Sequence, residues 1–239
     1  MAVTYMRKLE EEPETYNEGF TQLTNGINVR IQEWILNRVN PSDSVLEIGC
    51  GTGTLAAKMA LKGANIEAID KNYQMITHAM ENYPRDDSVN LVYQIGSFRD
   101  HHAEEGSFDV VVSTFVLSEL GALEQQILLR RAWRLLKPGG RLLISGEFTP
   151  KRFWKVPFAF QRWWWKRKLK KLKHQATMPV KWFLNYLNPI GFDVLDEKEW
   201  HHGSIRVYEL KKDNGKERNE PGYYKPSPRE FRGIKSQMR

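Results

Sequence analysis

The chain has 239 residues, of which 41% are hydrophobic, and a formal net charge of +7. This length fits one domain with additions, since domains usually hold about 100–200 residues. One cysteine, Cys50, excludes an internal disulfide, and no apolar run approaches the ~20 residues of a membrane-spanning helix. The N-terminus, M-A-V-T-Y-M-R-K-L-E-E-E, lacks the apolar segment of a signal peptide, so we expect a cytoplasmic protein.

Residues 1–40 are predicted to form an N-terminal helical cap. Apolar residues recur over 25–39 at the spacing of one helical face, namely Ile27, Ile31, Trp34, Ile35 and Val39. Strand and helix patterns then alternate. The predicted strands are 45–49, 65–70, 90–95, 108–114 and 140–146, and the predicted helices are 53–62, 72–82 and 122–136. This alternation predicts an α/β fold, with a parallel sheet that helices cover on both faces.

The C-terminal part adds two further predicted strands, at 192–195 and 205–210. The short connection through His201–Gly203 suits a hairpin, so this pair is expected to be antiparallel. The residues from 211 to 239 carry many charges together with several prolines and glycines. They are interpreted as a loosely ordered tail.

Three alternating glycines follow the first predicted strand, in V-L-E-I-G-C-G-T-G from Val45 to Gly53. Glycine lets the backbone approach a ligand closely, and the helix that follows offers unpaired N–H groups. The spacing G-x-G-x-G is one residue shorter than the dinucleotide fingerprint. Glu47, at the end of the strand, suits a cationic ligand. Asp70 ends the second predicted strand, where a carboxylate accepts the hydroxyls of a ribose.

These residues resemble the first two motifs of the class I S-adenosylmethionine-dependent methyltransferases. Phe108–Ser113 is similar to the fourth strand of that family, and Leu136–Ile144, with its L-K-P-G-G turn, is similar to the start of the fifth. The resemblance covers residues 40–150. It implies a Rossmann-like sheet of seven mostly parallel strands with an antiparallel C-terminal hairpin, and a methyltransferase domain over 41–210. It also implies S-adenosylmethionine as cofactor and S-adenosylhomocysteine as product.

The resemblance also assigns cofactor contacts. Glu47 and the glycine loop would hold the methionine end, Asp70 the ribose, and Lys71 to Met75 the adenine. The family places an acid after the third strand, but this chain has Gly96-Ser97-Phe98, so the adenine contact falls to Ser97 and Phe98, with Asp100 as a substitute acid. The predicted cofactor-binding residues are Tyr16, Glu47, Gly49, Gly51, Thr52, Gly53, Asp70, Lys71, Met75, Ser97, Phe98, Thr114 and Phe115.

The acceptor side offers one candidate general base, Glu119, in S-T-F-V-L-S-E-L after the fourth strand. The alternative is a carboxylate that caps or bridges near the start of the next helix. The neighbouring pair His101 and His102 is expected to be solvated, and Cys50 is interpreted as a small residue in a tight turn. No CxxC or HxxxH spacing occurs, so no metal site is predicted.

The N-terminus, Y-M-R-K-L-E-E-E-P-E-T-Y-N-E-G, is similar to the opening of methyltransferases associated with corrinoid proteins. This resemblance suggests a corrinoid protein as partner and a Tyr16 that folds over the cofactor. The alternative is a tyrosine that packs a surface helix. The chain also resembles quinone-ring C-methyltransferases, whose acceptors are apolar and membrane-borne. We therefore expect a small-molecule or lipid-like acceptor. A protein or RNA methyltransferase and a non-catalytic S-adenosylmethionine-binding partner subunit are the alternatives.

Residues 150–180 interrupt the α/β pattern with a basic, aromatic stretch. It contains no acidic residue, and Trp163, Trp164 and Trp165 lie among lysines and arginines. We interpret it as a lid insertion. Peripheral membrane contact, a lid without such contact and nucleic-acid binding are the three possibilities. Leu169 and Leu172 favour an amphipathic helix, and the lack of an RNA-binding module argues against nucleic acid.

Overall fold

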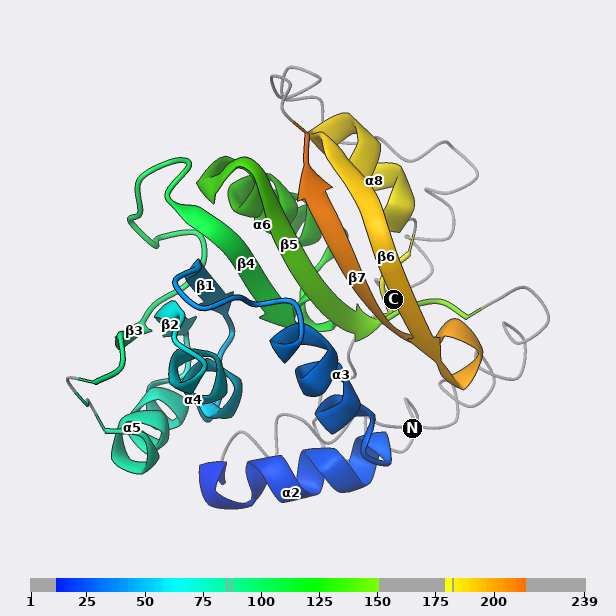
Figure 1. Ribbon diagram of the computed structural model, residues 1–239. Coiled ribbons are helices and arrows are strands. Elements are labelled where there is room, and N and C mark those ends of the chain that lie inside the picture. The colour runs from blue at the N-terminus through cyan, green and yellow to red at the C-terminus, as the bar shows by residue number, and fades with distance from the viewer. Residues whose placement is uncertain (1–11, 85, 87, 151–178, 182, 214–239) are drawn as a thin grey trace.

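The computed structural model describes residues 12–84, 86, 88–150, 179–181 and 183–213. Its centre is a seven-stranded sheet with the order β3-β2-β1-β4-β5-β7-β6 (Figure 1). The strands are β1 (Ser44–Ile48), β2 (Asn65–Asp70), β3 (Leu91–Ile95), β4 (Phe108–Thr114), β5 (Leu136–Glu147), β6 (Phe192–Trp200) and β7 (Ile205–Lys212).

Neighbouring strands from β3 to β5 pair in parallel, whereas β7 is antiparallel to both β5 and β6. A short 3-10 helix, His201–Gly203, makes the hairpin turn between β6 and β7. The predicted α/β class, with a Rossmann-like, mostly parallel sheet and an antiparallel C-terminal hairpin, is therefore confirmed.

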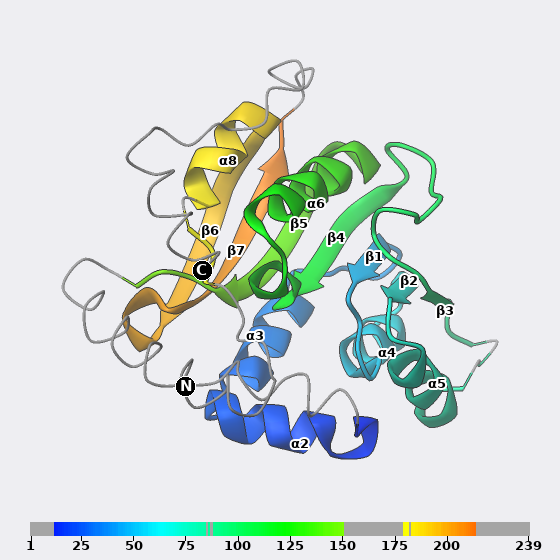
Figure 2. The same ribbon diagram turned by 180° about the vertical axis from the view of Figure 1, so that it is seen from behind.

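Helices cover both faces of the sheet. α3 (Ile27–Leu36), α4 (Thr54–Leu61) and α5 (Tyr73–Asn82) lie on one face, and α6 (Ala122–Leu135) and α8 (Phe183–Ile190) lie on the other (Figures 1 and 2). This double cover explains why β1 reads as an apolar run, since Val45 and Leu46 point to opposite apolar clusters and are fully buried. Among these helices, none has the length and apolar character that crossing a bilayer requires.

The N-terminal region contains two helices where the periodicity predicted one, over 25–39. α2 (Pro13–Thr24) precedes α3, which ends at Leu36. The break lies at Asn25 and Gly26, which have φ angles of 51° and 74°. An Asn-Gly pair is a common turn signal, but the prediction followed the apolar spacing and included both residues in one helix.

The carboxyl ends of β1, β2 and β4 meet at one edge of the sheet. The glycine loop follows β1, Asp70 ends β2, and the 3-10 helix η2 (Val116–Glu119) follows β4. After β1 the chain moves to β2 on one side, whereas β4 lies on the other, so this edge is the topological switch point where α/β folds bind ligands. α2 lies beyond the edge at which β4 ends (Figure 1).

Candidate functional site

The three glycines between β1 and α4 have different surroundings. A Cβ at Gly49 would collide with the side chain of Val116, and one at Gly53 would lie 2.8 Å from the Cβ of Ala79. Gly51 has a φ of +54°, and an added Cβ there would meet no atom of the described residues within 4 Å. Packing therefore accounts for Gly49 and Gly53, whereas only Gly51 presents its backbone to open space, where a ligand could approach.

Asp70 is held by two backbone donors. Its Oδ2 accepts a hydrogen bond from the amide of Gly51 at 2.9 Å, and its Oδ1 accepts one from the amide of Asn72 at 2.8 Å. These bonds fix the carboxylate beside the open side of the glycine loop. Each oxygen retains acceptor capacity, because a carboxylate offers about four lone-pair positions. The side chain is half-buried, so a pair of ribose hydroxyls fits this arrangement.

Glu47 lies beneath the same loop and is 1% exposed. It accepts a hydrogen bond from the amide of Ala56 in the first turn of α4. Its Oε2 is buried and has no hydrogen-bond partner among the described residues. Burial, together with the charge of Asp70, raises the pKa of Glu47 to about 8. An ammonium group on the loop fits this site, because a cation stabilises the charged carboxylate that burial disfavours.

The predicted adenine side combines exposed and buried side chains. Lys71 is largely exposed and Met75 is buried in the first turn of α5. Ser97 accepts a 3.3 Å hydrogen bond from the amide of Arg99, so its hydroxyl already has a local role. Phe98 is 8% exposed and packs into the apolar cluster on the α6 face. A contact of Ser97 or Phe98 with adenine remains a prediction.

A row of aromatic rings connects α2 to the end of β4. Phe20 meets Phe115 edge to face, with 4.9 Å between ring centroids, and Tyr16 stacks on Phe20 at 5.8 Å. Phe115 is buried and has a φ of 63°, a conformation that non-glycine residues rarely adopt. Thr114, just before it, is half-buried and pairs with Ser145. Tyr16 therefore contacts Phe20 of the same helix. Its position over the cofactor remains a prediction.

Glu119 ends η2 with its Oε2 3.7 Å from Nζ of Lys71. The alternatives to a catalytic role were capping of the next helix and bridging between elements. Glu124 caps α6, because it accepts a 3.0 Å hydrogen bond from the amide of Gly121 at the start of that helix. The ion pair of Glu119 with Lys71 connects the segment after β4 to the segment after β2. Its role as a base remains a prediction.

The expectation of a solvated histidine pair is wrong for His101. His101 is 6% exposed, and its Nε2 lies 3.3 Å from Oε1 of Glu67. Burial lowers its pKa, which the carboxylate of Glu67 partly offsets. His102 is exposed, as expected. The loop folds back onto β2, where His101 meets Glu67, a placement that the polar loop sequence did not indicate.

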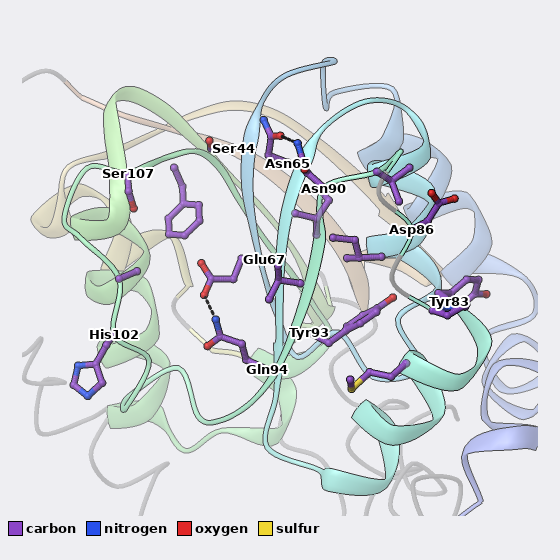
Figure 3. A pocket seen from close by; sticks show the side chains of 18 of the residues that line it. Ser44, Asn65, Glu67, Tyr83, Asp86, Asn90, Tyr93, Gln94, His102 and Ser107 are labelled. Atoms are coloured by element: carbon purple, nitrogen blue, oxygen red, sulfur yellow. Dashed lines mark hydrogen bonds between the residues drawn. The ribbon is translucent and has the colours of Figure 1, made fainter.

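A groove of about 940 Å³ lies elsewhere, around the edge strand β3 (Figure 3). It begins at the amino ends of the strands, with Ser44, Asn65 and Asn90, and includes Glu67, which accepts a 2.7 Å hydrogen bond from Gln94. None of the predicted cofactor-binding residues lines this groove. It is therefore separate from the site at the carboxyl edge.

Sequence reasoning missed Asn17, which contacts the glycine loop from α2. Its Oδ1 accepts a 2.9 Å hydrogen bond from the hydroxyl of Thr52. Asn17 directly follows Tyr16 within the N-terminal segment that resembles the corrinoid-associated methyltransferases, but that resemblance assigns a role only to Tyr16. The contact of Asn17 with the loop depends on the packing of α2. Two predictions fall largely outside the described residues, namely the lid at 150–180 and the tail at 211–239. For the lid, the described ends Phe148 and Val180 form a β-bridge beside β5.

Residues 45–140, from the start of β1 into β5, match a family model described as a methyltransferase domain. An enzyme named ubiquinone biosynthesis O-methyltransferase, from Xanthomonas oryzae pv. oryzae, is 37% identical over 106 residues, which are 42% of this chain and 41% of the relative. A carboxy-S-adenosyl-L-methionine synthase from a Shewanella species is 32% identical over 134 residues, 53% and 52% of the two chains. The matches therefore span about half the length of these curated relatives, or less.

Two solved structures show the same fold. An S-adenosylmethionine-dependent methyltransferase from Methanosarcina mazei superposes with a TM-score of 0.60 at 20% identity, over 75% of this chain and 96% of that one. A magnesium protoporphyrin IX methyltransferase from Synechocystis, solved with bound S-adenosylmethionine, gives a TM-score of 0.56 at 18% identity, over 77% of each chain. At these identities the likeness concerns the fold alone.

Proposed function

Since the chain contains a class I S-adenosylmethionine-dependent methyltransferase domain, we propose that it transfers the methyl group of that cofactor to a small-molecule acceptor. The observation that carries the proposal is the combination of three groups at the carboxyl edge: an accessible backbone at Gly51, a fixed carboxylate at Asp70, and a buried oxygen of Glu47 that has no partner among the described residues. These groups suit a backbone contact, a ribose and a cation, respectively. S-adenosylmethionine contains both the ribose and the cation.

The bound cofactor supplies a methyl group that its sulfonium already activates, so the residues of the chain bind, orient and exclude water. Glu47 and the glycine loop hold the methionine end, and Asp70 accepts from the ribose. Lys71, Met75, Ser97 and Phe98 border the adenine. Thr114 and Phe115, at the end of β4, would lie beside the methyl group, and Tyr16 on α2 would cover it.

The acceptor is proposed to be small or lipid-like. The name of the Xanthomonas relative, an O-methyltransferase of ubiquinone biosynthesis, supports this class. The aromatic row of Tyr16, Phe20 and Phe115 supplies apolar surface beside the carboxyl edge. Glu119 is proposed as the base that takes a proton from the acceptor.

Membrane contact through residues 150–180 and a corrinoid protein as partner are further proposals that derive from the sequence.

The decisive experiment follows methyl-labelled S-adenosylmethionine in the presence of the purified protein and separate lipid, metabolite, protein and RNA fractions. We expect label in the lipid or metabolite fraction, together with formation of S-adenosylhomocysteine. Label in protein or RNA would indicate one of the alternative substrate classes. Tight binding of S-adenosylhomocysteine without label uptake in any fraction would indicate a non-catalytic partner subunit.

A further inference from the structure

Asn17 on α2 contacts two threonines that lie on either side of Gly53. Its Nδ2 donates to Oγ1 of Thr54 at 3.0 Å, and the hydroxyl of Thr52 donates to its Oδ1 at 2.9 Å. The two threonine hydroxyls are 3.1 Å apart. Because the Thr52 proton is engaged with Asn17, Thr54 must be the donor between the hydroxyls. The three bonds therefore close a ring in which each donor has an acceptor.

This hydrogen-bond ring joins three elements of the fold. The hydroxyl of Tyr83, directly after α5, donates to Thr54 at 3.4 Å, which adds a connection to a third helix. Asn17, Thr52 and Thr54 all line a polar cavity of about 470 Å³, although Thr52 is only 3% exposed. Connected hydrogen bonds polarise one another, so losing one member weakens the others.

α2 has a second anchor on the acceptor side of the site. Phe20, one turn after Asn17, is 7% exposed and packs edge to face on Phe115 at the end of β4. The same helix thus contacts the glycine loop through a polar ring and the β4 exit through an aromatic pair. Neither contact can form fully unless α2 is docked.

We propose that Asn17 is a positioning residue that couples the docking of α2 to the shape of the glycine loop. By holding Thr52 and Thr54, Asn17 restrains the backbone on both sides of Gly53, whose φ is 74°, and thereby the neighbouring amide of Gly51. Cofactor affinity then depends on a docked α2, and a bound cofactor in turn shifts the equilibrium toward the docked α2, because such coupling is reciprocal. The cofactor part of this inference rests on the proposed function.

The first test compares Asn17→Ala with wild type in calorimetric titration with S-adenosylhomocysteine. We expect about tenfold weaker binding, since two hydrogen bonds to the loop are lost. Alanine is the best helix former, so the substitution does not weaken α2 itself. Glu18→Ala is the matched control, because Glu18 is exposed on the same helix and its side chain contacts Gln22 instead of the loop. It should bind like wild type.

The second test needs no ligand. In hydrogen exchange of the ligand-free proteins, the amides of residues 52–57 should exchange about tenfold faster in Asn17→Ala than in wild type or Glu18→Ala. A double variant of Asn17→Ala with Thr54→Val should accelerate exchange by less than the two single effects combined, because both substitutions open the same ring. Independent, additive effects of the two substitutions on exchange would overturn the proposal, as would unchanged exchange in Asn17→Ala.

The two tests separate the inference from the function on which it rests. If wild type fails to bind S-adenosylhomocysteine, the proposed function is wrong, and the exchange data alone decide whether Asn17 shapes the loop. If wild type binds and Asn17→Ala binds equally well, the coupling to the cofactor is wrong while the proposed function stands.

Discussion

Two carboxyl groups at the glycine loop have opposite environments. Asp70 is half-buried and accepts two backbone hydrogen bonds, whereas Glu47 is fully buried with one oxygen lacking a partner among the described residues. Asp70 therefore remains available as an acceptor for hydroxyl groups. Glu47 has a pKa raised to about 8, so it holds a proton at neutral pH until a cation displaces it. The two residues accordingly have different predicted roles.

Replacing Asp70 with alanine removes a charged acceptor for the ribose hydroxyls. A hydrogen bond to a charged group contributes about 1.5–3 kcal/mol, so S-adenosylhomocysteine should bind about ten- to a hundredfold more weakly in calorimetric titration. Asp193→Ala is a suitable control, because Asp193 is an exposed carboxylate on β6, at the opposite edge of the sheet from β2 and β3. Equal affinity in Asp70→Ala would contradict the ribose assignment.

The raised pKa of Glu47 predicts how stability changes with pH. The folded, ligand-free protein keeps a proton on Glu47 up to about pH 8, whereas the unfolded chain releases it near its ordinary value of about 4.3. The stabilisation is therefore present below about pH 4.3 and is lost as the pH rises through about 8. Over that window, melting temperature should fall more steeply in wild type than in Glu47→Gln. Parallel curves would show that Glu47 does not titrate in this way.

Glu119 tests the acceptor side of the proposal. If it is the general base, Glu119→Gln should lower turnover by about 10²–10⁴-fold while affinity for S-adenosylhomocysteine stays near that of wild type. If it only bridges to Lys71, turnover should survive and the melting temperature should change instead. Lys71→Gln removes the same ion pair without removing the carboxylate and serves as the comparison. If Glu119 is the base, Glu119→Gln should lose most of its turnover and Lys71→Gln should keep it. Equal losses in the two variants would contradict that role.

At the scale of elements, the glycine loop is a packed turn with one open position. Gly49 approaches η2 and Gly53 approaches α5 and β3, so these two residues hold the loop between neighbouring elements. Gly51 lies between them, and its amide donates to the carboxylate of Asp70. Fold stability and ligand binding should therefore respond to different glycines.

Gly53→Ala should be the more damaging substitution for stability. Its Cβ would lie 2.6 Å from the hydroxyl of Tyr93 and 2.8 Å from the Cβ of Ala79, in addition to the strain of a positive φ. Gly51→Ala carries only the strain, about 1–2 kcal/mol, but places a methyl group where the cofactor would lie. Thermal melting should rank Gly53→Ala as less stable. A Gly51→Ala variant that keeps wild-type affinity for S-adenosylhomocysteine would contradict the ligand role of Gly51.

At the scale of the whole molecule, the basic excess concentrates in one stretch of sequence. No acidic residue occurs between Phe148 and Phe192, in a chain with 29 acids. Within this stretch, the residues on either side of the basic, aromatic segment lie together. Phe148 forms a β-bridge with Val180, and the amide of Val180 donates to the carbonyl of Glu147. The stretch thus leaves and rejoins the sheet at the carboxyl end of β5, the edge that carries the candidate site.

Anionic membranes should bind this stretch. Each lysine near such a surface contributes about 1 kcal/mol, and the attraction is screened over ~10 Å at 0.1 M salt. Co-sedimentation should rise with the anionic lipid content of vesicles and fall with added salt. A variant with Lys166, Lys168, Lys170 and Lys171 changed to glutamine should lose sedimentation and keep its affinity for S-adenosylhomocysteine. Binding to RNA in place of vesicles would favour the nucleic-acid alternative.

The sequence alone predicted the fold class, the succession of strands and helices along the chain and the resemblance to S-adenosylmethionine-dependent methyltransferases. Buried parallel strands require apolar runs and their crossovers require helical periodicity, and both are properties of neighbouring residues. The candidate cofactor residues Gly51 and Asp70 were predictable for a related reason, since Gly51 lies in the loop that follows β1 and Asp70 ends β2. Parallel strands bring their carboxyl ends to one edge.

Only the tertiary structure decided the contacts between distant segments. Asn17 and Thr52 are 35 residues apart, and neither local sequence indicates a hydrogen bond between them, although the N-terminal resemblance predicts that the neighbouring Tyr16 lies over the cofactor. The burial of His101 likewise depends on a polar loop that folds onto β2 beside Glu67. Periodicity records which face of an element is apolar. It does not record which remote side chain completes a hydrogen bond, because that depends on how the elements pack.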